Sequence, residues 1–527
     1  MAMSWFREKA PAALAAALVP LFGLLVVARG HDADWDFRNY HWYNAYAWLT
    51  GRRGFDVAVA HHATYYNPLA DVPVFAAAQI LPAWCVGFLV GCMHGLNLWL
   101  LYRLSRAALG APRGSSGDWL ALAIAIAGTT GGMALILVGN ASNDMTVSLL
   151  VLLALLLMVR AGESPIHDTR ELWRFCAAGL AGGVAVGLKL TMAPFAIGLA
   201  FGALALRAPL RIRLRRIVTL GIGGLMGAAL TGGVWAYTLW QETGNPFFPY
   251  FNDIIGSPLI LDASYRDPRF LPESLGEALI YPFLFAWDGT QVNDMPFRDI
   301  KIALAYAIVP LTLLWMWVSR RAQFTQPMRL LFTVSAVSYA AWLSVFGIYR
   351  YVLTLEMLAP LLVALALTVW PTSNRRRWGM FAGLWLAALL GTGWSAIASV
   401  GGSWRGAYVD VTVPPIADPD HTLAVMAGVE PMGYIVPAFP AAMPFLRIDG
   451  WLDTPSSHSA FGDRMRARID THAGPIFGVF IERERARALA AFAADGLVLS
   501  DQDCATIESN IGEPLLWCAL QRQASSP

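Results

Sequence analysis

The chain has 527 residues, of which 57% are hydrophobic and 14% are charged, and its mean hydropathy is +0.50. Soluble proteins average about 25% charged residues, so this composition argues against a wholly water-soluble enzyme, and a disordered chain would show the opposite balance. The formal net charge of +2 is too even for a nucleic-acid-binding protein. The length allows one large membrane domain together with a soluble domain.

Eleven transmembrane helices are predicted from the apolar stretches of the sequence. The first, residues 10–27, follows a short basic leader and is either a signal peptide or a retained helix. We favour the helix, because the residues after it form a poor cleavage site and many further spans follow. The stretch 175–206 is too long for one span and contains Lys189 and Pro194, so we expect two short helices that form a hairpin. The other predicted spans are residues 72–101, 119–138, 145–159, 217–240, 302–318, 330–346, 352–370 and 379–399.

Five clusters of arginine lie in the loops between these stretches. They fall on one face of the membrane only if the predicted hairpin crosses it twice, and because cytoplasmic loops are rich in Lys and Arg, that face is the inner one. The N-terminus is then cytoplasmic, and residues 31–71, 241–301 and 401–527 lie on the outer face. Arg52 and Arg53 also fall on the outer face and count mildly against this scheme. The many Ala, Arg and Gly residues suggest a bacterium, whose cytoplasmic (inner) membrane would hold the chain. The clusters are Arg103, Arg106 and Arg113; Arg160, Arg170 and Arg174; Arg207, Arg211, Arg213, Arg215 and Arg216; Arg320, Arg321 and Arg329; and Arg375, Arg376 and Arg377.

The tail, residues 401–527, has a soluble composition and predicts a small α/β domain. Its Cys504 and Cys518 would lie on an oxidising face, where they either form a disulfide or remain two unpaired thiols. The predicted fold is therefore an all-α polytopic membrane bundle over residues 1–400, followed by an extracytoplasmic α/β domain. Within that domain, strands are predicted over 423–425, 445–448, 476–481 and 515–520, and helices over 461–472 and 482–495.

The first outer loop carries the densest polar cluster of the sequence. Asp32, Asp34 and Asp36 alternate with other residues directly after the first helix. A solvated loop with an interfacial aromatic belt is one explanation, but three acids are more than a membrane anchor needs. Aromatic rings interleaved with acids and amides also suit sugars, whose C–H faces stack while their hydroxyls form hydrogen bonds. The candidate substrate-binding residues of this loop are Arg38, Asn39, Tyr40, His41 and Asn67.

Three further charged side chains lie at or near the outer ends of predicted helices. Lys189 lies within the apolar hairpin, where an ammonium costs about 2.5–3.5 kcal/mol and is a functional candidate by default, with snorkelling or structural pairing as the alternative. Arg350, next to Tyr351, suits contact with a phosphate, and a structural pair with Glu356 is the alternative. Asp144 could serve as a second acid or a metal ligand, and capping of the following helix is the alternative.

A short basic leader, one helix and an outer loop with an acidic cluster resemble the GT-C class of integral membrane glycosyltransferases. Within this class, WDFRNYHWYNAYAWLTGR at 35–52 and TYYNPLADVP at 64–73 are similar to bacterial glycosyltransferase family 87 and protein-mannosyltransferase-like proteins. TGNPFFPYFN at 243–252 resembles the aromatic outer-loop motif of such proteins. The resemblance covers the membrane part of the chain.

The resemblance implies a polyprenyl-phosphate sugar as donor, transfer outside the cytoplasm and an essential acid in the first loop. We favour Asp36 as that acid, followed by Asp34, although the Asp-x-Asp-x-Asp spacing departs from the acidic pair of many members. Glycosyl transfer needs a base for the acceptor hydroxyl and positive charge for the departing phosphate, which Lys189 and Arg350 would supply. A carboxylate at a partly dehydrated membrane surface has a raised pKa and is a stronger base. A single base without a covalent intermediate would invert the anomeric centre.

The sequence leaves the metal, the acceptor and two rival functions open. Asp-x-Asp spacing permits Mg²⁺ or Mn²⁺ without requiring either, whereas the adjacent His61 and His62 lack the spacing of a helical metal pair. The transferred unit would be a hexosyl or pentosyl group, and the acceptor a glycan, lipid or protein. The rivals are a transporter or flippase for lipid-linked glycans and a non-enzymatic assembly or sensory protein. A transporter should place polar residues near the midplane, often in two related halves, whereas the acids here gather at the outer rim.

Overall fold

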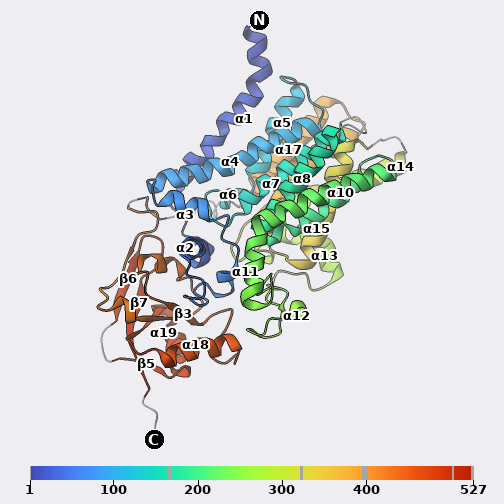
Figure 1. Cartoon of the computed structure of the whole chain (residues 1–527). Coiled ribbons are helices and arrows are strands. Elements are labelled where there is room, and N and C mark those ends of the chain that lie inside the picture. The colour runs from blue at the N-terminus through green and yellow to red at the C-terminus, as the bar shows by residue number, and fades with distance from the viewer. Residues whose placement is uncertain are drawn as a thin grey trace.

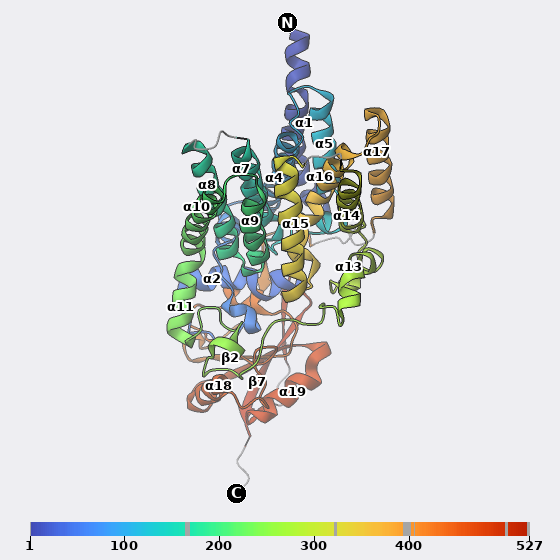
Figure 2. The same ribbon diagram turned by 90° about the vertical axis from the view of Figure 1, so that its right-hand side faces the viewer.

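The structure is a computed structural model that describes residues 2–163, 169–320, 324–393, 402–404, 406–500 and 504–523. Helices stand side by side in a bundle, and a smaller domain that contains a β-sheet lies at one end of it (Figure 1, Figure 2). Within the described residues, eight helices are long and apolar enough to cross a membrane. The predicted fold class, a polytopic helical bundle with a C-terminal α/β domain, is confirmed.

Each of the eleven predicted spans contains helix, but two of them are broken. The stretch 72–101 forms two helices separated at residues 79–82, and 119–138 is also divided in two. The end of the span predicted over 379–399 lies outside the described residues, and the number of membrane crossings stays a prediction. The helices of the bundle are α1 (Ala2–Arg29), α3 (Val72–Ala78), α4 (Ala83–Ala108), α5 (Ser116–Thr129), α6 (Gly132–Ile136), α7 (Asp144–Gly162), α8 (Thr169–Leu188), α9 (Ala193–Ala205), α10 (Leu210–Ala228), α11 (Val234–Thr243), α14 (Lys301–Ser319), α15 (Gln326–Val345), α16 (Leu353–Val369) and α17 (Asn374–Gly391).

Serine or threonine precedes several of these helices because its hydroxyl satisfies a backbone N–H that has no partner inside the helix. Ser115 Oγ, for example, accepts a hydrogen bond from Asp118 N at 3.2 Å at the start of α5. The other hydroxyl caps are Ser274, Thr325, Ser373 and Ser459.

The predicted hairpin over 175–206 is confirmed, and its turn lies at Lys189. Helix α8 ends at Leu188, Lys189 is extended, and a short 3₁₀ turn, η3 (Leu190–Met192), leads into α9, where Pro194 is tolerated in the first turn. The far end of α9 returns to the far end of α7, since the side chain of Leu206 faces Gly162. The hairpin therefore brings a lysine to one end of the bundle.

Glycine lets α8 pack closely against α10. Gly179, Gly183 and Gly187 recur every four residues along one face of α8. A Cβ atom at Gly183 would lie 1.9 Å from the carbonyl oxygen of Gly224 on α10. Small residues at this spacing allow the backbones of membrane helices to touch, which is what this pair does.

The loops of the predicted inner face meet at the bundle end remote from the α/β domain (Figure 1). Arg174 Nη1 donates a hydrogen bond to the Arg160 carbonyl at 2.8 Å, and Gln326 Oε1 accepts one from Arg207 N at 2.9 Å. The first contact lies within one predicted basic cluster, and the second joins the loops of two others. Which side of a membrane they face stays a prediction.

The two outer loops are folded into short elements. The first contains a π-helix, η1 (Phe37–His41), followed by α2 (Trp42–Thr50) and a 3₁₀ turn, η2 (His61–Tyr65). The second contains α12 (Asn252–Ile255), α13 (Leu275–Trp287) and η5 (Gly289–Gln291). A π-turn inserted between α-helical residues is often found at functional sites, and η1 directly follows the three acids.

The C-terminal domain is built on one mixed sheet of order β1-β6-β7-β4-β2-β3, with β5 added to β7. Strand β2 pairs in parallel with both β3 and β4, and the remaining pairs are antiparallel. The four predicted strands and both predicted helices are confirmed, whereas β1, β5 and β6 were not predicted. Cys504 and Cys518 form a disulfide. The elements are β1 (Val411–Thr412), η8 (Pro419–His421), β2 (Leu423–Ala427), η9 (Gly433–Ala438), β3 (Phe445–Asp449), α18 (Ala460–Thr471), β4 (Ile476–Ile481), η10 (Glu482–Glu484), α19 (Arg485–Ala494), β5 (Leu497–Leu499), β6 (Ala505–Ser509) and β7 (Leu515–Arg522).

The first outer loop and the C-terminal domain share one hydrophobic core. Phe37, Tyr43 and Val59 of the loop belong to the same buried cluster as Phe439 and Trp517 of the domain. The loop is therefore held by the domain as well as by the bundle. The predicted boundary near residue 400 falls outside the described residues and stays a prediction.

Arg52 and Arg53, which counted against the predicted sidedness, serve as structural links at this junction. Arg52 forms a buried ion pair with Asp56 at 2.6 Å and donates to the carbonyls of Ala441 and Met443 in the C-terminal domain. Arg53 pairs with Glu242 at 2.5 Å. Their charges are used in local contacts, which explains two basic residues in a loop predicted on the outer face.

Candidate functional site

Four charged side chains meet at the bundle end that bears the C-terminal domain. Arg350 Nη1 lies 2.5 Å from Asp36 Oδ2, and Lys189 Nζ lies 2.7 Å from Asp144 Oδ1. The two pairs touch, because Arg350 Nε lies 3.9 Å from Asp144 Oδ2. Both cations lie near the ring of Tyr351, whose centroid is 5.3 Å from Lys189 Nζ and 5.5 Å from Arg350 Cζ. These five residues are the charge cluster.

Each member of the charge cluster lies where a helix begins or ends. Asp36 immediately precedes η1, and Asp144 is the first residue of α7. Lys189 occupies the turn between α8 and α9, while Arg350 and Tyr351 lie in η6 (Tyr349–Val352), which leads into α16. Helix ends can carry charge because their side chains reach the membrane surface. The sequence placed these residues at the outer rim, and the fold brings them into contact.

Two structural alternatives drawn from the sequence are wrong. Asp144 does not cap α7, since Asn143 holds the N-cap position and the Asp144 carboxylate pairs with Lys189. Arg350 does not pair with Glu356. Glu356 Oε1 instead accepts from Ala134 N at 3.1 Å and lies 3.7 Å from Lys301 Nζ.

Lys301, the first residue of α14, belongs to a second buried group. Its Nζ lies 2.8 Å from Asp299 Oδ2, which also accepts a hydrogen bond from Gly132 N at 2.7 Å. These contacts tie the end of the second outer loop to α6 and α16. This group therefore holds neighbouring backbone in place and is not part of the charge cluster.

Burial and charge give the three acids of the first loop different pKa values. Burial, reinforced by the neighbouring Asp34, raises the pKa of Asp32 to about 7. Burial and the charge of Asp36 raise the pKa of Asp34. Burial alone would also raise the pKa of Asp36, but the charge of Arg350, with those of His41 and Lys189, lowers it. The expected rise in pKa at a dehydrated surface thus holds for Asp32 and Asp34 and is wrong for Asp36, whose pKa Arg350 lowers.

A histidine and an unpredicted aspartate pair with each other in the same loop as the three acids. His41 Nδ1 lies 2.8 Å from Asp71 Oδ1, and Asn143 Nδ2 donates to the same oxygen at 2.6 Å. The other ring nitrogen of His41, Nε2, is buried and has no hydrogen-bond partner among the described residues. Asp71 lies near the end of the TYYNPLADVP segment, but its pairing with a residue thirty positions earlier depends on how the loop folds back.

The remaining predicted substrate-binding residues lie around the charge cluster. The amide of Asn39 donates to the carbonyl of Ala60 at 3.3 Å and is buried. Asn67 donates to the carbonyls of Gly187 and Thr231, so it fastens the loop to α8 and the neighbouring π-turn, η4 (Ala229–Gly233). Both amides therefore hold backbone in place.

Tyr40 and Arg38 extend in different directions from η1. Tyr40 packs on His41 and meets Tyr66 edge-on at 5.2 Å. Tyr66 in turn shares a hydrogen bond with Tyr250 of the second outer loop. Arg38 lies close enough to Tyr434 of the C-terminal domain for its charge to act on that hydroxyl. Aromatic rings thus border the charge cluster on the side of the second outer loop.

The donor set does not fit a divalent cation. Asp36 and Asp144 are paired with guanidinium and ammonium groups, and both oxygens of Asp32 accept backbone N–H groups, from Asp34 and Ala141. Across the described ranges, no three His, Cys, Asp or Glu side chains are grouped so that they could hold a metal ion. A cation at Asp36 or Asp144 would have to compete with Arg350 or Lys189, and Asp34 Oδ2 already accepts a hydrogen bond from Asp36 N at 3.3 Å.

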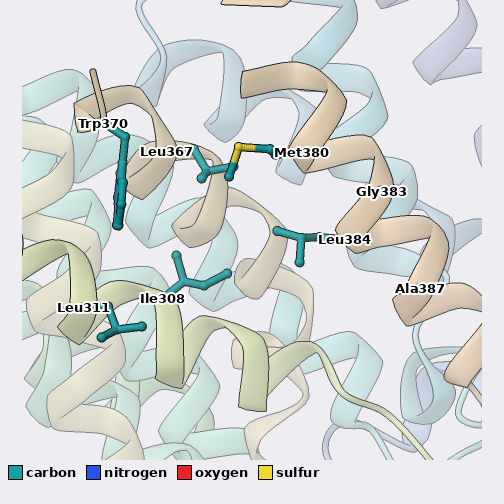
Figure 3. A pocket seen from close by; sticks show the side chains of 8 residues that line it. All are labelled: Ile308, Leu311, Leu367, Trp370, Met380, Gly383, Leu384 and Ala387. Atoms are coloured by element: carbon teal, nitrogen blue, oxygen red, sulfur yellow. The ribbon is translucent and has the colours of Figure 1, made fainter. Parts of the chain in front are cut away.

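An apolar pocket of about 440 Å³ lies between α14, α16 and α17, as Figure 3 shows. Trp370, at one side of it, follows the end of α16, whereas Arg350 precedes the start of that helix. By the rise of an α-helix the two are roughly 25 Å or more apart. With no charged group in its wall, this pocket suits hydrocarbon and cannot hold a phosphate. Its lining residues are Ile308, Leu311, Leu367, Trp370, Met380, Gly383, Leu384 and Ala387.

Comparison with known proteins finds one structural likeness to report. No family model matches the chain, and no curated protein matches it. Among solved structures, the chain is similar to the oligosaccharyltransferase of Archaeoglobus fulgidus in its apo form. The two are 13% identical, the superposition covers 94% of this chain and 72% of that chain, and the TM-score is 0.48. At this TM-score the likeness does not establish a shared fold.

Proposed function

We propose that this chain is a GT-C-type integral membrane glycosyltransferase that moves a hexosyl or pentosyl group from a polyprenyl-phosphate donor to an acceptor hydroxyl. The observation that carries the proposal is the charge cluster, in which two cations and two acids meet at one end of an apolar bundle. A lipid with a phosphate headgroup matches this arrangement, because its tail can lie along the helices while its phosphate reaches the cations. The reaction would take place on the extracytoplasmic side of a bacterial inner membrane, with the N-terminus in the cytoplasm.

Lys189 and Arg350 are proposed to bind the donor phosphate. A guanidinium presents two parallel N–H groups to phosphate oxygens, and an ammonium adds a compact charge. Both cations approach the same carboxylate, that of Asp144, so a phosphate would meet them together. The ring of Tyr351 contacts both cations.

Asp36 is proposed as the general base, activated by the donor itself. In the resting state Arg350 holds the carboxylate and lowers its pKa, which weakens it as a base. A phosphate that engages Arg350 would offset this charge, and burial would then raise the pKa of Asp36. The base would thus gain strength only when the donor is bound. Asp34, whose pKa is already raised, is the second candidate.

The proposed step is a single displacement. The acceptor oxygen forms a bond to the anomeric carbon while its proton moves to the base. The bond between that carbon and the phosphate oxygen breaks, and its electron pair leaves with polyprenyl phosphate, whose charge Lys189 and Arg350 stabilise. Attack on the face opposite the leaving group inverts the anomeric centre.

Sugar transfer from a radiolabelled polyprenyl-phosphate sugar tests the proposal, with purified protein in lipid vesicles and a cell-envelope extract as acceptor. The Asp36→Asn variant should lose about 10²–10⁴-fold in turnover, the usual contribution of a general base, while still binding the donor. Asp253→Asn, an exposed acid of the second outer loop, is the matched control and should retain full activity. Unchanged turnover of Asp36→Asn, with Asp34→Asn equally active, would contradict the mechanism and favour an assembly or transport function.

A further inference from the structure

Four flat rings stack where the first outer loop meets the C-terminal domain. Trp35, which lies between Asp34 and Asp36 in the sequence, stacks on Trp451 with centroids 4.9 Å apart and planes 17° apart. His61 lies within 6.3 Å of Trp35 and 5.6 Å of Trp451, and His62 within 6.1 Å of Trp451, all with nearly parallel planes. These four residues are the aromatic platform.

The aromatic platform is held rigidly by the histidine at its base. His61 Nδ1 accepts a hydrogen bond from Trp451 N at 3.3 Å, so Nε2 carries the proton and donates to the Val429 carbonyl at 3.1 Å. Gly450 allows this contact, because a Cβ atom there would lie 1.9 Å from His61 Nδ1. His61 itself has φ of +55°, a strained conformation of a kind that concentrates at functional sites.

One ring of the aromatic platform, that of Trp451, is open to solvent. Trp451 is 51% exposed, although it is a large apolar side chain in a folded domain. Burying such a ring is worth about 1.5 kcal/mol or more, so its exposure has no benefit for folding. An exposed indole that is backed by stacked rings offers a flat apolar face on which a ligand can pack.

The aromatic platform also lies next to Asp36, the proposed base. Trp35 adjoins Asp36 in the chain, and His62 lies close enough to Asp36 for the two to interact electrostatically. His62 also meets Tyr66 edge-on at 5.8 Å, which places it between the aromatic platform and the rings that border the charge cluster. Burial lowers the pKa of His62 to about 4, so its neutral ring offers one donor and one acceptor to a hydroxyl.

We propose that the aromatic platform is the acceptor subsite, and that the acceptor is a glycan one of whose sugar rings stacks on Trp451 while its reacting hydroxyl reaches Asp36. This deepens the proposed function and rests on it. The C–H face of a pyranose matches the flat apolar surface of the indole, and the ring hydroxyls match His62 and the carboxylates. A peptide acceptor would instead use backbone hydrogen bonds along an extended edge, and the aromatic platform presents rings rather than strand edge.

Binding to two arrays tests this assignment: one of bacterial cell-envelope oligosaccharides and one of Ser/Thr-containing peptides, probed with detergent-solubilised, fluorescently labelled protein. We expect the wild type to bind members of the glycan array. Trp451→Ala should bind the same glycans about five- to tenfold more weakly, as expected for loss of one ring contact, and Trp451→Phe should recover most of the signal. Trp287→Ala is the matched control, because Trp287 is 72% exposed but lies in the second outer loop, and it should bind as the wild type does.

Donor binding, measured on the same variants by native mass spectrometry with polyprenyl phosphate, separates the two proposals. Trp451→Ala should keep donor binding, which also shows that the variant is folded. Equal glycan binding by wild type and Trp451→Ala, or binding to the peptide array alone, would overturn the acceptor subsite and leave the proposed transferase intact. Failure of the proposed transferase function would give a different result: the Arg350→Gln variant would bind polyprenyl phosphate as well as the wild type does.

Discussion

The Lys189–Asp144 pair allows a structural role to be separated from a functional one. The Asp144 side chain is fully buried and that of Lys189 is 16% exposed, and their atoms lie 2.7 Å apart. Breaking a buried ion pair by removing one partner costs about 3–5 kcal/mol, because a charge is left without compensation. Lys189→Met should fall near the lower end, about 3 kcal/mol, because Arg350 remains 3.9 Å from the Asp144 carboxylate.

Replacing Asp144 should lower the free energy of unfolding less than replacing Lys189 does. The double variant should lose less than the sum of the two single losses. Asp144→Asn leaves Lys189 Nζ with its 2.7 Å hydrogen bond to the Ser142 carbonyl. Lys189→Met combined with Asp144→Asn removes both charges, so the two effects should be non-additive by about 0.5–3 kcal/mol. The free energy of unfolding is measurable by SDS titration in mixed micelles, with tryptophan fluorescence as the signal.

Turnover of the same three variants completes the test. If Lys189 binds the donor phosphate, the double variant should regain stability and remain inactive, because the phosphate still lacks a cation. Additive stability losses would refute the ion pair as a coupled unit. A double variant as active as the wild type would refute the phosphate-binding role and leave the pair as a purely structural feature.

Four further outcomes are expected. If Asp36 is the base, kcat/KM should stay high as the pH falls and drop only below the ordinary carboxylate range. The base must be deprotonated, and Arg350 lowers the pKa of Asp36. If Asp34 is the base, the drop should begin at higher pH, because the pKa of Asp34 is raised. Replacing Arg350 by Gln should raise the pKa of Asp36, read without donor from the carboxylate infrared band that the further change Asp36→Asn removes, and an unchanged pKa would contradict the pairing. Gly183→Leu should lower the thermal stability in detergent, since even a Cβ atom would lie 1.9 Å from a backbone oxygen of α10, whereas Gly221→Leu, on the open face of that helix, should be tolerated. Dialysis against EDTA should leave sugar transfer unchanged, because Asp36 and Asp144 are paired with Arg350 and Lys189; activity restored by Mg²⁺ or Mn²⁺ after chelation would show that a metal displaces these cations.

Much of the site followed from the sequence because charge is rare in an apolar chain. The sequence identifies Lys189 and Arg350 as cations at or near helix ends. The distribution of arginines predicts that both lie near the same membrane surface as Asp36. This shared position at one membrane surface was predictable from composition and helix length. The 2.5 Å contact between Arg350 and Asp36 was not, because it depends on the tertiary fold. The two residues are 314 positions apart in the chain, and no local pattern links them.

Features that depend on the loops' tertiary path were not predictable. Asp71 pairs with His41 only because the first outer loop turns back through η2. Trp451 reaches Trp35 from the other end of the chain, since the C-terminal domain shares its core with that loop. Helical periodicity and hydropathy describe each span alone. They carry no information on which loops pack against each other or against the C-terminal domain. The lowered pKa of Asp36 belongs to the same class, because it depends on a partner from η6.

Native mass spectrometry with polyprenyl phosphate tests the central claim most directly, which is that the charge cluster binds a lipid-borne phosphate. The wild type and Asp36→Asn should retain the lipid, whereas Arg350→Gln should lose it, and polyprenol without phosphate should bind poorly to all of them. Arg269→Gln, an arginine of the second outer loop whose side chain is 61% exposed, should behave like the wild type. Retention of polyprenyl phosphate by Arg350→Gln and by Lys189→Met at wild-type levels would contradict the account.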